Sequence, residues 1–183
     1  MARAVPSRLA EFTAGRTAAR AAMRALGLPE IAVPMGPDRA PVWPNGVVGS
    51  IAHTNGVCVA LIARAGPITG IGVDLEPADP LPADLWPTVL TAAEMAMLDQ
   101  LPKETRGQTA KLLFSAKEST YKCIYPQIQT VLDFSDMEIR HDTVGQSFSA
   151  TLLRQAGPFV PGTLWRGNYA VVDLMIATVM VLR

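Results

Sequence analysis

The chain has 183 residues, of which 49% are hydrophobic and 17% charged, and its formal net charge is zero. This balance fits one folded domain, or two small lobes with a shared core, and excludes a disordered chain. A neutral chain has no general attraction for nucleic acid or a membrane surface, so any binding of phosphate must be local.

The first half of the chain predicts one helix, an irregular loop and three strands. Small residues between regularly spaced arginines predict a helix over residues 11–26, which Gly27 and Pro29 end. The following residues up to position 46 are rich in proline and glycine and predict a loop. Short apolar runs bounded by turn residues predict three strands, over residues 47–51, 57–63 and 68–76.

The second half predicts two helices followed by β structure. The proline-rich residues 77–90 form the predicted linker, and Thr91 with Glu94 forms a capping-box pattern that opens a helix to about residue 101. After a polar break at residues 103–107, a longer helix is predicted up to residue 124, with Pro126 as its stop. Four further strands are predicted over residues 134–140, 147–153, 162–172 and 174–182. This order predicts an α+β protein with one lobe over residues 1–80 and another over residues 81–183.

No segment predicts export or membrane insertion. The N-terminal residues lack the apolar core of a secretory signal, and the longest apolar run near the end is too short to span a bilayer. Cys58 and Cys123 lie in apolar surroundings and predict buried thiols in a reducing compartment, not a disulfide framework. We therefore expect a cytoplasmic protein, monomeric and without a nucleic-acid partner.

Asp74 and Glu76 end the third predicted strand, one residue apart. Alternate strand residues share a face, so both carboxylates point to one side while Ile71, Val73 and Leu75 point to the other. Two interpretations are open. The pair is either a solvated strand edge, or the ligands of a cation such as Mg²⁺ that relieves their repulsion.

Glu118 and Lys122 are four residues apart on the longer predicted helix. One interpretation is a surface ion pair, worth roughly 0.3–0.5 kcal/mol. The helix is apolar around most of its circumference, however, which indicates burial, and buried charges need partners beyond each other. A metal ion with a diphosphate would satisfy both side chains.

Further candidates are a histidine and three arginines. His53 ends a strand at a polar turn and is either structural or functional; with His141 the only other histidine and no cysteine pair, zinc is disfavoured. The guanidinium groups of Arg16, Arg20 and Arg39 are either solvated or phosphate anchors. Motifs of serine hydrolases, P-loop proteins and Rossmann folds are absent from the sequence.

Four segments together resemble the 4′-phosphopantetheinyl transferases of the Sfp type, which activate surfactin synthetase. The enterobactin synthetase component D branch is the nearest subgroup. The segments are Gly15–Arg20, Arg39–His53, Gly72–Glu76 and Phe114–Lys122.

The resemblance implies two similar α/β lobes related by a pseudo-twofold axis, with coenzyme A in the cleft between them. It implies Mg²⁺ (or Mn²⁺) bound by Asp74, Glu76 and Glu118, with Lys122 on the diphosphate. A carrier-protein serine attacks the β-phosphate, 3′,5′-adenosine bisphosphate leaves, and Glu118 or a metal-bound water is the base. The implied contacts to the nucleotide's phosphates are Arg16, Thr17, Arg39 and His53.

Two features depart from the family pattern. Ala52 stands where the family usually has Ser or Thr before the histidine, which removes one expected hydroxyl contact to coenzyme A. Related chains usually carry several tens of residues before the Gly15 segment, so the first lobe is expected to be shortened at its N-terminus.

The predicted function is Mg²⁺-dependent transfer of 4′-phosphopantetheine to apo carrier proteins of peptide, polyketide or siderophore synthesis. One alternative is a non-catalytic module that binds coenzyme A or a carrier protein. The other is a Mg²⁺-dependent phosphohydrolase, which the carboxylates alone would also fit.

Overall fold

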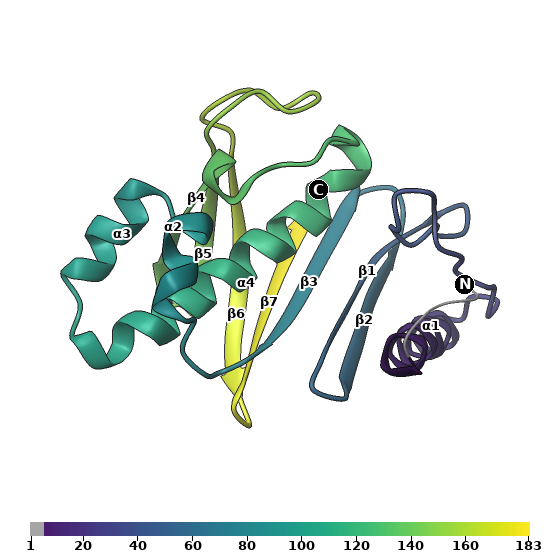
Figure 1. Ribbon diagram of the computed structural model, residues 1–183. Helices are drawn as coiled ribbons and strands as arrows, with labels where there is room; N and C mark the ends of the chain where they lie inside the picture. Colours follow the sequence, from purple (N-terminus) through teal and green to yellow (C-terminus); the bar gives the residue numbers. More distant parts are fainter. Residues whose placement is uncertain (1–5) are drawn as a thin grey trace.

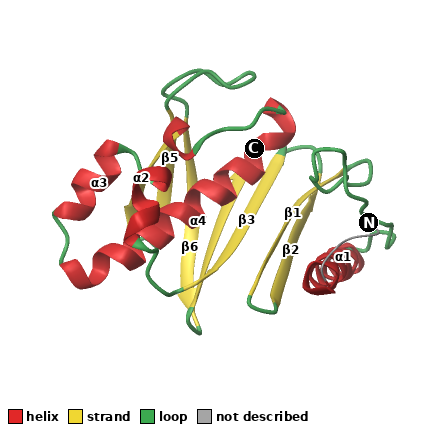
Figure 2. Cartoon of the chain, viewed as in Figure 1, coloured by secondary structure: helices red, strands yellow, loops and turns green. Residues whose placement is uncertain are grey.

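The computed structural model describes residues 6–183 as helices packed on two antiparallel sheets, which confirms the predicted α+β class (Figures 1 and 2). The helices are α1 (Pro6–Ala25), α2 (Trp86–Val89), α3 (Ala92–Asp99) and α4 (Lys103–Ile128), with 3-10 turns η1 (Ala83–Leu85) and η2 (Phe134–Asp136). The strands are β1 (Val47–Thr54), β2 (Val57–Arg64), β3 (Gly70–Pro77), β4 (Met137–Asp142), β5 (Ser147–Leu152), β6 (Leu164–Val172) and β7 (Met175–Leu182). None of these helices combines the length and the apolar character needed to cross a membrane.

The smaller sheet is a hairpin of β1 and β2, against which α1 packs. Its two turn residues, Asn55 and Gly56, have φ values of 46° and 78°, as the tightest hairpin turns require. Ala19 and Met23 of α1 are buried in a small apolar cluster against which Ile51 of β1 also packs. Helix α1 and the hairpin therefore form one unit, at the right of Figure 1.

The larger sheet has the strand order β3-β7-β6-β5-β4, and α4 crosses one of its faces (Figure 1). Buried side chains alternate along β5 and β7, as Phe148, Ala150 and Leu152 do on β5, and they form the main core with α4. Strand β3 is the edge nearest the hairpin. The Val73 amide of β3 donates a hydrogen bond to the Ser50 hydroxyl of β1 at 3.1 Å.

Helix α4 is longer than predicted at both ends. The predicted polar break at residues 103–107 was wrong, because these residues form the start of α4. The glycine there has a packing role: a Cβ atom added at Gly107 would lie 2.6 Å from the Cβ of Pro80. Pro126 as a stop was also wrong. A proline near the end of a helix removes only one backbone hydrogen bond, and the helix continues to Ile128, where Gln129 takes a left-handed conformation.

The sheets divide the chain between β2 and β3, near residues 65–69. The predicted third strand is β3, and it pairs with β7, so it belongs to the larger sheet although the sequence-based division grouped it with residues 1–80. The predicted linker, residues 77–90, contains η1 and α2. The lobe boundary at residue 80 and the pseudo-twofold axis stay predictions.

Both cysteines are free thiols in surroundings of different kinds. Cys123 of α4 is fully buried, and burial raises its pKa to about 12. Cys58 of β2 is only partly buried, although burial raises its pKa as well. Neither is therefore ionised at neutral pH, as a reactive thiolate would be.

Candidate active site

Asp74 and Glu76 lie on the face of β3 that packs against α4. Gly70 and Gly72 precede them on the same face. A Cβ atom at Gly72 would overlap the main-chain carbonyl oxygen of Ser119 on α4. The glycines therefore let the helix approach the backbone of β3, which brings the two carboxylates within reach of side chains on α4.

Asp74 is the centre of the site and is almost fully buried, with 5% of its surface exposed. Its Oδ1 accepts a hydrogen bond from Lys122 Nζ at 2.5 Å, and its Oδ2 accepts one from the Ser115 hydroxyl at 2.8 Å. Lys122 Nζ also lies 3.8 Å from a carboxylate oxygen of Glu118, one helical turn earlier. The two segments on which the sequence interpretation depends therefore meet.

Glu76 pairs with a lysine that the sequence pattern did not single out. Lys111 Nζ lies 3.5 Å from Glu76 and 3.2 Å from Asp79, and Lys111 is largely buried. Lys111 precedes Ser115 by four residues and Glu118 by seven, spacings that place all three on one side of a helix. That spacing is the signal in the sequence that could have revealed Lys111.

Asp74, Glu76 and Glu118 form the acid cluster, in which both glutamates have raised pKa values. Burial raises the pKa of the Glu118 carboxyl; the Lys122 ammonium opposes this rise, and the charge of Asp74 adds to it. Burial likewise raises the pKa of Glu76, with Asp74 adding to the rise and Lys111 opposing it. Since Asp74 repels both glutamates, a divalent cation among the three would lower both pKa values.

This donor set suits a hard divalent cation in its chemistry. Carboxylate oxygens are the ligands that Mg²⁺ and Mn²⁺ prefer, and positive charge relieves the repulsion between the acids. Within residues 6–183, however, no three His, Cys, Asp or Glu side chains are already gathered as a metal site. Lys122 now supplies the positive charge at Asp74. A cation that binds Asp74 through Oδ1 must therefore compete with this ammonium group.

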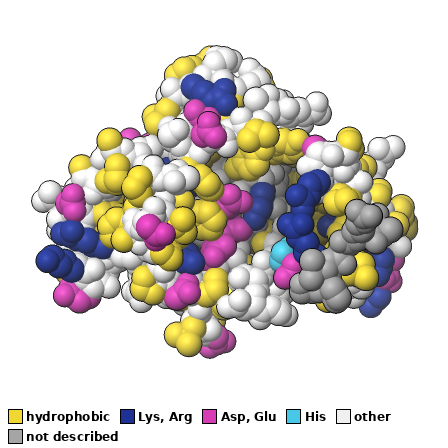
Figure 3. Space-filling model, in the orientation of Figure 1, with side chains coloured by type: hydrophobic (Ala, Val, Ile, Leu, Met, Phe, Trp, Pro, Cys, Tyr) yellow, Lys and Arg dark blue, Asp and Glu magenta, His cyan; other side chains and the backbone are white. Residues whose placement is uncertain are grey.

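The predicted phosphate-binding residues lie on the hairpin side of the molecule. His53 of β1 is half-exposed, and its Nδ1 lies 3.7 Å from a carboxylate oxygen of Glu11 on α1. Figure 3 shows two charged groups on one face: acidic and basic side chains together over α4 and β3, and a band of basic side chains with a histidine over the hairpin. This arrangement offers a positively charged surface beside the acid cluster.

Arg39 is exposed and lies in a loop that is docked on α4. The Tyr125 hydroxyl, near the end of α4, donates to one carboxylate oxygen of Asp38 at 2.8 Å, and the Ala40 amide donates to the other at 3.1 Å. Arg39 has a φ of 71°, which is uncommon for a residue with a Cβ atom. Among the described residues its guanidinium has no hydrogen-bond or ion-pair partner, so it is available to an anion.

Arg16 is already engaged with the protein itself. Its Nε donates to the Val33 carbonyl oxygen at 2.8 Å, and its guanidinium lies over the Phe12 ring, 4.3 Å from the centroid. Burial lowers the pKa of this guanidinium. The structure therefore gives Arg16 a role in holding the loop around Val33, which the sequence pattern did not indicate.

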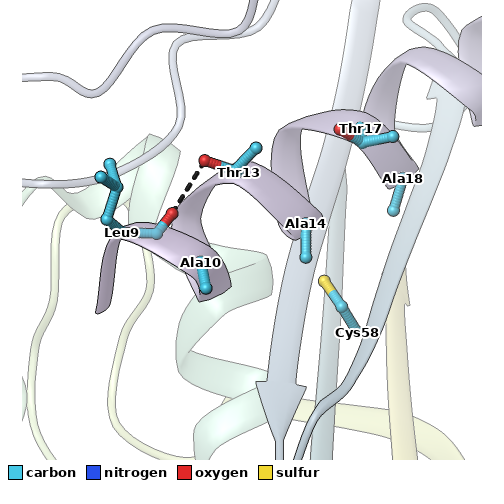
Figure 4. Close-up of a pocket in the computed structure, with 7 residues that line it drawn as sticks. All are labelled: Leu9, Ala10, Thr13, Ala14, Thr17, Ala18 and Cys58. Atoms are coloured by element: carbon cyan, nitrogen blue, oxygen red, sulfur yellow. Dashed lines mark hydrogen bonds between the residues drawn. The ribbon is translucent and has the colours of Figure 1, made fainter. Parts of the chain in front are cut away.

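Thr17 lines an open groove of about 820 Å³ between α1 and β2 (Figure 4). The groove is lined by Leu9, Ala10, Thr13, Ala14, Thr17, Ala18 and Cys58. Figure 4 shows the Cys58 thiol directed toward Ala14, and Arg20 Nη2 donates to the Thr17 hydroxyl at 3.4 Å. None of the described residues that line this groove is charged, so the carboxylates between β3 and α4 are the better candidate for chemistry.

Comparison with known families finds two matches that together span most of the chain. Residues 1–63 match the 4′-phosphopantetheinyl transferase N-terminal domain, and residues 70–171 match the 4′-phosphopantetheinyl transferase superfamily. The gap between the two matches falls where the chain passes from the hairpin to the larger sheet.

Curated proteins of the same kind are similar over most of the chain. The 4′-phosphopantetheinyl transferase Svp of Streptomyces mobaraensis is 40% identical over 182 residues, covering 97% of this chain and 74% of that protein. The 4′-phosphopantetheinyl transferase PptT of Mycobacterium tuberculosis is 31% identical, covering 100% of this chain and 82% of that protein. Enterobactin synthase component D of Salmonella typhi is 36% identical, covering 66% of this chain and 50% of that protein.

Proposed function

Because the chain belongs to the 4′-phosphopantetheinyl transferase superfamily, as the resemblance predicted, we propose that it transfers the 4′-phosphopantetheine group of coenzyme A to a serine of an apo carrier protein. The observation that carries this proposal is the meeting of Asp74, Glu118 and Lys122 between β3 and α4. Transfer of a phosphoryl-type group needs positioning and charge neutralisation more than covalent help from the protein. Carboxylates beside an ammonium group supply both.

The acid cluster has a defined role in this proposal. Asp74, Glu76 and Glu118 hold a Mg²⁺ ion, which neutralises charge on the diphosphate when it is bound. Lys122, which donates a hydrogen bond to Asp74, binds the same diphosphate. Lys111 stays with Glu76 and Asp79 and limits the negative charge of the site.

The reaction exchanges one phosphorus–oxygen bond for another. The hydroxyl oxygen of the carrier serine attacks the β-phosphorus of coenzyme A. The bond from that phosphorus to the bridging oxygen breaks, and 3′,5′-adenosine bisphosphate leaves with the oxygen. The proposed acceptor of the serine proton is Glu118, because its carboxylate is partly exposed beside Asp74 and Lys122.

The nucleotide's phosphates are bound on the hairpin side. Arg39 and His53 are exposed and offer a guanidinium and an imidazole. Arg16 supports this surface by holding the Val33 carbonyl, and Thr17 adds a hydroxyl beside Arg20. The proposed setting is a cytoplasmic monomer, and the similarity to enterobactin synthase component D supports carriers of siderophore synthesis as candidate substrates, along with those of peptide and polyketide synthesis.

Mass spectrometry of an apo carrier protein tests the proposal directly. The carrier is incubated with the full chain, coenzyme A and Mg²⁺, and we expect it to gain the mass of one phosphopantetheine group. Tight binding of coenzyme A without a gain of mass would instead identify a binding module. Release of nucleotide or phosphate without any carrier would identify a phosphohydrolase.

Asp74→Ala ties the activity to the acid cluster. Loss of this carboxylate should lower the transfer rate by roughly 10²–10³-fold, the cost of removing one group that stabilises charge in the transition state. Asp84→Asn is the control, since Asp84 is an exposed acid in η1 that makes no ion pair with another described residue. Circular dichroism checks that both variants fold. Wild-type turnover by a folded Asp74→Ala variant would refute the assignment.

A further inference from the structure

Two buried hydroxyl groups lie against Asp74 on the side away from solvent. Ser115 of α4 and Thr178 of β7 are both fully buried. The Ser115 hydroxyl donates to Oδ2 of Asp74 at 2.8 Å. An ionised carboxylate can only accept hydrogen bonds, so the single hydroxyl hydrogen of Ser115 is committed to Asp74.

Thr178 in turn holds Ser115. Thr178 is the direct pairing partner of Asp74 across β3 and β7. Its hydroxyl donates to the main-chain carbonyl oxygen of Ser115 at 2.9 Å, and it lies 3.0 Å from the Ser115 hydroxyl oxygen. The β7 strand therefore holds the turn of α4 from which Ser115 reaches Asp74.

Packing alone does not require hydroxyl groups at these positions. Thr178 alternates with Ile176 and Met180 on the buried face of β7, where a valine has nearly the same volume. A hydroxyl in such a place is tolerated only when it is hydrogen-bonded. Both hydroxyls are hydrogen-bonded here: Thr178 donates to the main chain of Ser115, and Ser115 donates to Asp74.

We propose that Ser115, supported by Thr178, is a positioning residue for Asp74. It keeps Oδ2 turned toward the interior, so that Oδ1 faces Lys122 and the bound ligand. This proposal rests on the function proposed for the acid cluster. Loss of a residue that orients a metal ligand typically lowers metal affinity or activity by roughly 10–100-fold.

The first test compares Ser115→Ala with Ser119→Ala. Ser119 is a matched control, because it is also fully buried on α4 but its hydroxyl donates to the Ala116 carbonyl oxygen at 3.2 Å. Binding of Mn²⁺ alone to the full chain is measured by electron paramagnetic resonance, and kcat and KM for coenzyme A are measured separately. We expect Ser115→Ala to lose about 10-fold or more in Mn²⁺ affinity and in kcat. Ser119→Ala should stay close to wild type.

The second test keeps the proposal decidable if Ser115→Ala does not fold. Thr178→Val removes the supporting hydroxyl and keeps the shape, and Thr178→Ser keeps the hydroxyl. Thr120→Val is the control, since the buried Thr120 hydroxyl donates to the Ala116 carbonyl oxygen of its own helix. We expect weakened Mn²⁺ binding in Thr178→Val alone. The proposal is overturned if Ser115→Ala and Thr178→Val bind Mn²⁺ as tightly as their control variants do. This outcome can be read whether or not the wild type transfers phosphopantetheine. Absence of transfer by the wild type refutes the proposed function instead.

Discussion

Helix α4 carries two charged clusters of opposite character, and the neighbouring residues Lys117 and Glu118 belong to different ones. The Lys117 side chain is 2% exposed, and its ammonium group donates three hydrogen bonds, to Glu94 at 2.7 Å and to the carbonyl oxygens of Val89 and Phe134 at 2.8 Å. Glu94 also accepts bonds from two main-chain amides, that of Thr91 at the N-cap of α3 and that of Ile139 on β4. All three hydrogens of the Lys117 ammonium and both carboxylate oxygens of Glu94 are therefore hydrogen-bonded inside the protein.

The acid cluster is built differently. The side chains of Glu118 and Lys122 are 30% and 29% exposed. The carboxyl groups of Glu76 and Glu118 have raised pKa values, because burial and the charge of Asp74 disfavour their ionised forms. A fully satisfied buried pair joins elements together, whereas a partly satisfied and partly exposed group of like charges is prepared for a charged ligand. On α4, the Lys117–Glu94 pair is therefore expected to stabilise the fold, and the acid cluster is expected to bind the ligand.

Removal of the Lys117 ammonium has the largest expected effect on stability. Burial lowers the pKa of Lys117 more than Glu94 raises it, so desolvation dominates this group. Lys117→Met leaves Glu94 buried without its counter-charge and should lower the free energy of unfolding by roughly 3–5 kcal/mol. Urea denaturation measures the loss. Transfer activity of the folded fraction at low temperature should persist, because the acid cluster lies on the other side of α4.

Lys103→Met is the matched control for this variant. Lys103 is an exposed lysine at the start of α4, and its removal should change the free energy of unfolding by less than about 0.5 kcal/mol. If Lys117→Met proves as stable as Lys103→Met, the structural role of the buried pair is wrong.

Gly72→Ala tests the close approach that forms the acid cluster. Its Cβ atom would overlap the Ser119 carbonyl oxygen, so α4 must move away from β3, at an expected cost of about 1–3 kcal/mol. Transfer should fall further than this loss of stability explains, since the bonds of Asp74 to α4 are displaced. Gly167→Ala is the comparison, because its Cβ atom would meet the Phe148 side chain and the Val179 carbonyl oxygen within the larger sheet, and none of its three nearest atoms belongs to α4. Equal activity in the two variants would argue against the close approach as the basis of the site.

The local part of the site was predictable from the sequence. Alternation along β3 placed Asp74 and Glu76 on one face, and the four-residue spacing placed Glu118 beside Lys122, because both patterns depend only on the periods of strand and helix. The capping box of Thr91 and Glu94 is confirmed for the same reason.

The non-local part was not predictable. Ser115 and Thr178 are 63 residues apart, and their meeting depends on β7 pairing with β3 in one register, which no local pattern specifies. Glu94 was predicted as a helix cap, but its pairing with Lys117 follows from the packing of α3 on α4. The irregular loop before β1 had no period to interpret, so neither the carbonyl partner of Arg16 nor the docking of the Arg39 segment on Tyr125 could be foreseen.

The smallest expected effect is a gain of stability when one acid of the cluster is neutralised. Between the ordinary carboxyl pKa and its raised pKa, Glu118 binds more protons in the folded state than in the unfolded state, so the free energy of unfolding falls as pH rises through that window. The full penalty is present above the raised pKa. Glu118→Gln should therefore be more stable than wild type at pH 7, by about 0.5 kcal/mol, with the difference fading below the ordinary carboxyl pKa.

Glu104→Gln is a control of opposite sign for this last variant. Glu104 is exposed in the first turn of α4, where a negative charge interacts favourably with the helix dipole. Its neutralisation should lower the free energy of unfolding by about 0.3 kcal/mol. Urea denaturation of both variants at pH 7 and near pH 4 gives the comparison. A Glu118→Gln variant that loses stability at neutral pH would show that Lys122 satisfies Glu118 fully. The acid cluster would then resemble the Lys117 pair, and the distinction between the two sides of α4 would fail.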